Sequence, residues 1–167
     1  MKKLSTRQLA LSGIAAGLYA ALTILTGAIS YGSIQFRLAD ALCVLVCFEP
    51  SVTIGLTLGC LIANLFSTVS ALDIFVGTAA TLLACLLTAP IRKPLLVPLP
   101  SVLANAALVG AMLAFVYFPE SFWRGFWLLC AEVAFGEAAV LYLLGVPLYL
   151  FIRRSGLISR LMSAEPK

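Results

Sequence analysis

The chain has 167 residues, of which 62% are hydrophobic and 11% are charged, and its formal net charge is +4. Soluble globular domains carry about 25% charged and about 45–50% apolar residues, so this composition would leave a water-facing surface apolar almost everywhere. It therefore excludes a soluble enzyme, a disordered tail and a nucleic-acid-binding domain. It indicates an all-α integral membrane protein, with one membrane domain over residues 1–167.

Six apolar segments follow one another along the chain, separated by polar residues, charges or prolines. A helix needs about 20 apolar residues to cross the hydrocarbon core of a bilayer, so six spans account for most of the sequence. Several segments end at a proline, which is a usual sign of helix termination. The expected transmembrane helices cover residues 8–29, 38–48, 51–66, 73–89, 99–118 and 125–152.

The second segment is the shortest, because Glu49 and Pro50 interrupt it after residue 48. As an α-helix, residues 38–48 would rise about 17 Å, against a hydrocarbon core of about 30 Å. We therefore expect either a short helix that neighbouring helices bury, or a helix break at Glu49 within the membrane.

Basic residues gather at three places along the chain, and their positions predict the topology. By the positive-inside rule, such clusters lie on the cytoplasmic side of the membrane. Four spans between the first two clusters and two more before the third satisfy this rule. We therefore expect a multi-pass plasma membrane protein with both termini in the cytoplasm. The clusters are Lys2, Lys3 and Arg7, then Arg92 and Lys93, then Arg153, Arg154, Arg160 and Lys167.

Two oppositely charged residues, Arg37 and Asp40, stand three positions apart at the expected outer end of the second span. Residues at i and i+3 share one face of a helix. The two side chains therefore either form a salt bridge with each other or act as a polar clamp for a ligand that enters from outside.

Glu137 occupies the energetically least favourable position in the sequence, because it lies near the middle of the sixth span. A carboxylate at that depth costs at least ~2.5–3.5 kcal/mol and needs a partner or a wet cavity. Asn105 lies at a similar depth in the fifth span, and Asn64 lies near the outer end of the third. These side chains either hold helices together by hydrogen bonds or bind a polar solute.

Small residues repeat at helical spacing on the first span, where Ala16 and Ala20 form an AxxxA pair. Small residues at this spacing let two helices approach closely. The pair therefore serves either packing within the chain or docking of another membrane subunit.

The sequence contains no catalytic constellation and no energy source of its own. It has no histidine, which removes the commonest general acid–base group and metal ligand, and it has no GxxxxGK[ST] motif for ATP. We expect no enzyme activity, no metal and no other cofactor. A small membrane protein with these features suggests a solute-binding subunit that depends on a separate motor.

Residues 34–42, IQFRLADAL, resemble the hallmark segment of the QueT family, whose members are substrate-binding S components of energy-coupling factor (ECF) transporters. The resemblance extends over about residues 8–152. The further matching segments, in the same order, are GCLIANLF at 59–66, DIFVGTAATL at 73–82, PSVLANA at 100–106, GE at 136–137 and LGVPL at 144–148.

This resemblance implies a bundle of six helices with a substrate site open to the outside. It implies a queuosine precursor as the substrate, meaning a deazaguanine base or its nucleoside. It also implies a separate T membrane subunit, docked by Ala16 and Ala20, and two ATP-hydrolysing subunits. The family pattern has Glu at the position that Asp40 occupies in this chain, so Asp40 departs from it. The expected substrate-binding residues are Glu137, Asn105, Asp73, Asn64, Asp40 and Arg37.

Two alternatives stay open on the sequence alone. An S component for another vitamin would have the same six helices and the same AxxxA pair. A membrane scaffold subunit without transport activity would use the polar residues only to hold its helices together, and it would bind no small ligand.

Overall fold

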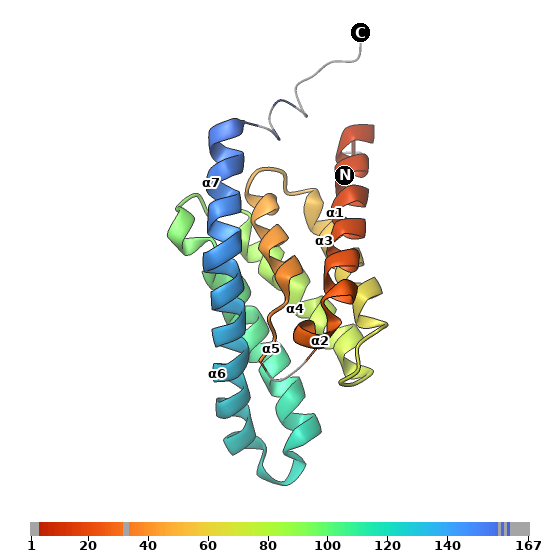
Figure 1. The fold of residues 1–167 in the computed structure, drawn as a ribbon, viewed down its shortest axis with the longest axis vertical. Helices are drawn as coiled ribbons and strands as arrows, with labels where there is room; N and C mark the ends of the chain where they lie inside the picture. The colour runs from red at the N-terminus through yellow and green to blue at the C-terminus, as the bar shows by residue number, and fades with distance from the viewer. Residues whose placement is uncertain (1–3, 32–33, 157, 159, 161–167) are drawn as a thin grey trace.

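The computed structural model describes residues 4–31, 34–156, 158 and 160, and the regular secondary structure of these residues is all helical. The long helices lie beside one another in an elongated bundle (Figure 1). The elements are α1 (Thr6–Leu25), α2 (Gly27–Ser30), η1 (Leu38–Cys47), α3 (Val52–Asn64), α4 (Leu72–Thr88), η2 (Pro94–Leu96), α5 (Leu99–Tyr117), η3 (Pro119–Ser121), α6 (Phe122–Val140), η4 (Leu141–Gly145) and α7 (Val146–Ser155). The predicted all-α class is confirmed.

The outer surface of the bundle is apolar, as a lipid-facing surface must be. Leu25, Phe75 and Leu143 are 84%, 74% and 73% exposed, and a soluble monomer rarely exposes extensive apolar surface of this kind. Each of the six predicted spans is helical, but only three helical stretches reach spanning length by themselves. These are Thr6–Leu25, Pro94–Tyr117 and Pro119–Ser155, and the shorter apolar helices are Leu38–Cys47, Val52–Asn64 and Leu72–Thr88.

The second predicted span is a 3₁₀-helix, η1, rather than an α-helix. A 3₁₀-helix rises about 2.0 Å per residue, so η1 is roughly 20 Å long. Most of its side chains are buried, and it contacts α1, α3, α4, α6 and α7. Of the two expectations for this segment, the structure has the short helix that its neighbours bury, and η1 ends at Cys47, before Glu49.

The sixth predicted span is one helical column that changes its winding once. Between α6 and α7, Leu141–Gly145 form a π-helical turn, η4, and Pro147 follows it. Proline has no N–H to close an α-helical bond, and its ring crowds the carbonyl one turn earlier. The helix widens at that point, as π turns do.

Helices α1 and α3 pack closely because glycines on α3 face the backbone of α1. A Cβ at Gly55 would lie 2.0 Å from the carbonyl oxygen of Ser12, and one at Gly59 would lie 2.6 Å from that of Ala16. Ala20, one turn after Ala16, is 8% exposed. The backbone at Ala16 thus packs within this chain, and the docking of another subunit by Ala16 and Ala20 stays a prediction.

The basic clusters lie at one end of the bundle. In Figure 1, the start of α1, the connection after α4 and the end of α7 lie towards the same end, while the connection between α5 and α6 lies at the other. The hydroxyl of Tyr149 on α7 donates a hydrogen bond of 2.9 Å to the carbonyl of Arg92. This arrangement agrees with an even number of crossings between the clusters. Lys2, Lys3 and Lys167 lie outside the described residues.

Candidate functional site

Polar side chains from α1, η1, α3, α4, α5 and α6 meet inside the bundle. The buried charged residues of the described chain are Arg37, Asp40, Asp73 and Glu137, and each is at most 3% exposed. The amides Asn64 and Asn105 are buried as well. All six residues predicted to bind the substrate thus avoid the lipid-facing surface. Burying charges is costly unless they are paired and hydrogen bonded, so a cluster of four such groups indicates a functional site.

Arg37 pairs with Asp73 and not with Asp40. Arg37 precedes η1 with φ −81° and ψ 87°, which is not a helical conformation, so the i, i+3 relationship does not bring it to Asp40. Its Nη2 lies 3.9 Å from Asp73 Oδ1, and its Nη1 donates to the Cys60 sulfur at 3.8 Å. The alternative of an Arg37–Asp40 salt bridge is therefore wrong.

Asn64 and Asp73 connect the end of α3 to the start of α4. Asn64 Nδ2 donates to the backbone carbonyl of Asp73 at 3.0 Å, and the Ser67 hydroxyl donates to Asp73 Oδ2 at 2.7 Å. A Cβ at Gly77 would lie 2.7 Å from Asn64 Nδ2 and 2.8 Å from Asp73 Oδ1. Glycine at this position leaves the space that the two side chains occupy.

Asp40 and Glu137 form the other half of the cluster. Asn105 Nδ2 donates to Glu137 Oε1 at 2.6 Å, and the Tyr19 hydroxyl donates to Asp40 Oδ1. Among the described side chains, neither carboxyl group forms a salt bridge.

Several atoms of the cluster have no hydrogen-bond partner, although buried polar atoms in proteins are nearly always paired. The unpartnered donors are Nε and Nη2 of Arg37. The unpartnered acceptors are Asp40 Oδ2, Asn64 Oδ1, Asp73 Oδ1, Asn105 Oδ1 and Glu137 Oε2. A ligand with both donors and acceptors would satisfy such a set.

Tyr31, in the connection after α2, lies beside the C-terminal end of α3, beyond the spanning segments. Its hydroxyl donates a hydrogen bond of 2.5 Å to the carbonyl of Ala63. Partial burial raises the pKa of the Tyr31 phenol above its ordinary value, so the group stays protonated and remains a donor. The bond anchors the connection that leads to Arg37.

Sequence reasoning missed two members of the cluster, Tyr19 and Cys60. Tyr19 lies deep in the first span, whereas tyrosines of membrane proteins gather at the interfaces, and this position was a usable signal. Cys60 offered no signal, because a cysteine in an apolar run is usually a small buried residue. In the structure its sulfur also accepts hydrogen bonds from Asn64 at 3.3 Å and from Thr81 at 3.1 Å.

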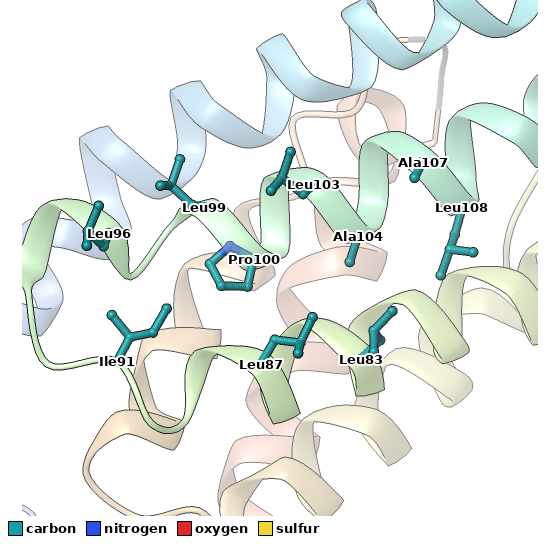
Figure 2. Close-up of a pocket in the computed structure, with 10 residues that line it drawn as sticks. All are labelled: Leu83, Leu87, Ile91, Leu96, Leu99, Pro100, Leu103, Ala104, Ala107 and Leu108. Atoms are coloured by element: carbon teal, nitrogen blue, oxygen red, sulfur yellow. The ribbon is translucent and has the colours of Figure 1, made fainter.

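A separate groove of about 600 Å³ lies along α4 and α5, and all its lining side chains are apolar. Figure 2 shows leucines of both helices, among them Leu83, Leu87 and Leu103, lining it together with Pro100. Leu87 and Leu103 are 50% and 67% exposed, so the groove opens on the lipid-facing surface. Ligand sites need a few converging polar groups for specificity, and we therefore assign the site to the buried cluster.

Comparisons with known proteins bear on both the fold and the site. The family model described as QueT transporter matches residues 9–154. A curated relative, the queuosine precursor transporter QueT of Lactococcus lactis subsp. cremoris (strain MG1363), is 40% identical over 84 residues. That alignment covers 49% of this chain and 49% of the relative, so it spans about half the length of each. No solved structure matches the chain.

Proposed function

This chain belongs to the QueT transporter family, and we propose that it is the substrate-binding membrane subunit of an ATP-driven ECF importer. In this role, the multi-pass plasma membrane protein captures a queuosine precursor, a deazaguanine base or its nucleoside, from outside the cell. The energy comes from two separate ATPase subunits, which act through a T membrane subunit.

The set of unpartnered buried atoms is the observation that carries this proposal. The Watson–Crick edge of a deazaguanine presents N–H donors beside a carbonyl acceptor. Oxygens of Asp40, Asn105 and Glu137 are free to accept from the N–H groups, while Nε and Nη2 of Arg37 are free to donate to the carbonyl. A scaffold subunit would instead be expected to pair these atoms with one another, because each unpartnered buried group is destabilising.

The proposed dependence on partner subunits rests on the absence of an ATP-binding motif from the sequence. Its sequence has no P-loop motif, and the described residues contain no group of three or more potential metal ligands. Accumulating a solute requires an energy source, so the proposal places ATP hydrolysis in other subunits. We propose that Ala16 and Ala20 on α1 dock the T subunit, since small residues at this spacing permit close helix contact.

An uptake experiment tests both parts of the proposal. Cells that cannot synthesise queuosine are given a precursor base, and the queuosine content of their tRNA is measured. We expect queuosine only when the chain is expressed together with the T subunit and both ATPases. Uptake by the chain alone would contradict the ECF mechanism, and absence of uptake with all subunits present would contradict the substrate assignment. An ATPase variant that cannot hydrolyse ATP serves as the control.

A further inference from the structure

The apolar groove along α4 and α5 ends at a basic connection. Two of its lining residues, Ile91 and Leu96, stand on either side of Arg92 and Lys93 in the sequence. Figure 2 shows Ile91 and Leu96 at the same end of the groove and Leu108 at the other. Arg92 and Lys93 are both exposed. The groove thus begins beside two cations and continues between apolar side chains alone.

The length of the groove corresponds to one leaflet of the bilayer. Its lining on α5 runs from Leu99 to Leu108, and this stretch of α-helix rises about 14 Å. Half of a hydrocarbon core of about 30 Å is about 15 Å. A groove that starts at the basic end of the bundle therefore reaches close to the bilayer midplane, which is the depth that one acyl chain occupies.

The positive charges at the basic end of the groove have no acidic partner within the described part of the chain. Neither Arg92 nor Lys93 forms a salt bridge there. Nη1 of Arg92 donates to the carbonyls of Cys47 at 2.9 Å and Ala89 at 2.7 Å, which are neutral acceptors. Glu49, two residues after Cys47, accepts hydrogen bonds of 3.2 Å from neutral donors. The connection therefore complements an anionic group from outside the chain.

We propose that the groove is a site for an anionic phospholipid, with one acyl chain between α4 and α5 and the phosphate beside Arg92 and Lys93. The occupant has to be amphipathic, because the lining is apolar and its end is cationic. Lipid tails are as apolar as leucine, so the groove supplies shape and the cations supply selectivity. Basic pockets between membrane helices bind anionic lipid headgroups in this way.

The chain offers a matched control for each half of the site. Ala107 lines the groove and is exposed, so Ala107→Phe places a ring where the acyl chain would lie. Ala131 on α6 is also exposed but lies outside the groove lining, and Ala131→Phe adds the same volume there. Lys93→Gln removes one cation from the site, whereas Arg124→Gln removes an exposed cation near the start of α6.

The test compares two lipids with the same acyl chains and different headgroup charge. Native mass spectrometry of the detergent-purified chain measures binding of phosphatidylglycerol, which is anionic, and of phosphatidylcholine, which has no net charge. We expect phosphatidylglycerol to bind one-to-one and about 5- to 30-fold more tightly, the effect of one or two cations at a membrane surface. Lys93→Gln should lower this preference about fivefold, and Arg124→Gln should leave it unchanged.

The groove itself is tested by the two phenylalanine variants. Ala107→Phe should abolish the one-to-one binding of phosphatidylglycerol, and Ala131→Phe should keep it. If Ala107→Phe cannot be purified folded, Ala107→Leu takes its place. Equal binding of the two lipids by the unchanged chain would overturn the inference, because the groove would then take up any lipid or detergent. Undiminished phosphatidylglycerol binding by the folded Ala107 variant would overturn it as well.

Discussion

The side-chain amide of Asn105 on α5 donates a hydrogen bond of 2.6 Å to the carboxyl group of Glu137 on α6, and both side chains are at most 3% exposed. One oxygen of each residue, Asn105 Oδ1 and Glu137 Oε2, has no partner. The pair therefore connects two helices and still presents acceptors to the interior. This combination is why we interpret it as part of a binding site and not solely as a helix–helix contact.

Removing Asn105 should weaken the bundle by a measurable amount. We expect the coupling between Asn105→Ala and Glu137→Ala to be about 0.6 kcal/mol and at most about 1.7 kcal/mol, as for other hydrogen bonds between membrane helices. A double-mutant cycle, built from unfolding of the single and double variants in mixed detergent micelles, measures it. Strictly additive effects, within about 0.3 kcal/mol, would show that the bond contributes nothing to stability.

Replacing Tyr19 by Phe should weaken ligand binding and leave the fold intact. The hydroxyl orients Asp40, and losing one hydrogen bond corresponds to about 1 kcal/mol, or roughly five- to tenfold in affinity. Tyr149→Phe is the control, because the Tyr149 hydroxyl donates to the Arg92 carbonyl at 2.9 Å, outside the cluster. Calorimetry on the two variants tests this, and equal affinities would remove Tyr19 from the site.

A methyl group at Gly77 should disturb the site more than the fold. The added Cβ would meet the side-chain ends of Asn64 at 2.7 Å and Asp73 at 2.8 Å. These side-chain ends can move without shifting the backbone. We therefore expect ligand affinity to fall about tenfold or more. The loss in unfolding free energy should stay below the cost of overpacking a core, which is about 1–3 kcal/mol. Nothing lies within 4 Å of a Cβ at Gly13, and Gly13→Ala should therefore bind normally. Normal binding by Gly77→Ala would contradict this account of the site.

The six-span topology expected from the sequence predicts which connections a reagent outside the cell can reach. Glu120, between α5 and α6, and Lys93, after α4, are both exposed. A membrane-impermeant maleimide applied to intact cells should label Glu120→Cys, and it should label Lys93→Cys only after permeabilisation. The unchanged chain gives the background. Its cysteines Cys43, Cys47, Cys60 and Cys85 are buried, and only Cys130 is partly exposed. Labelling of Lys93→Cys in intact cells would contradict cytoplasmic termini.

Residue type and position in the sequence singled out five polar residues of the cluster, and the QueT resemblance added the sixth, Asp73. The five are Arg37, Asp40, Asn64, Asn105 and Glu137. A carboxylate in the middle of a membrane span, such as Glu137, is energetically unfavourable without a polar partner or a wet cavity. Asn105 lies at a similar depth in the neighbouring span and was therefore the expected partner. The boundaries of the longer helices were also predictable, because prolines and charges interrupt the apolar runs. α5, for example, covers Leu99–Tyr117, against the predicted 99–118.

Other features depend on tertiary contacts that no local pattern encodes. Arg37 finds its partner at Asp73, on a different helix, because the backbone at Arg37 is not helical. The 3₁₀ winding of η1 accompanies burial on nearly every side. Residue spacing alone favoured a local pair between Arg37 and Asp40. It gave no information on Cys60, whose sulfur forms its hydrogen bonds only once α3 and α4 pack together.

Equilibrium binding to the isolated chain tests the central claim most directly. The detergent-purified protein is titrated calorimetrically with a queuosine precursor base, without ATP or partner subunits, and guanine is the control ligand. The account predicts saturable one-to-one binding of the precursor, tighter than that of guanine. A folded sample that binds no precursor would contradict the claim that this chain captures the substrate.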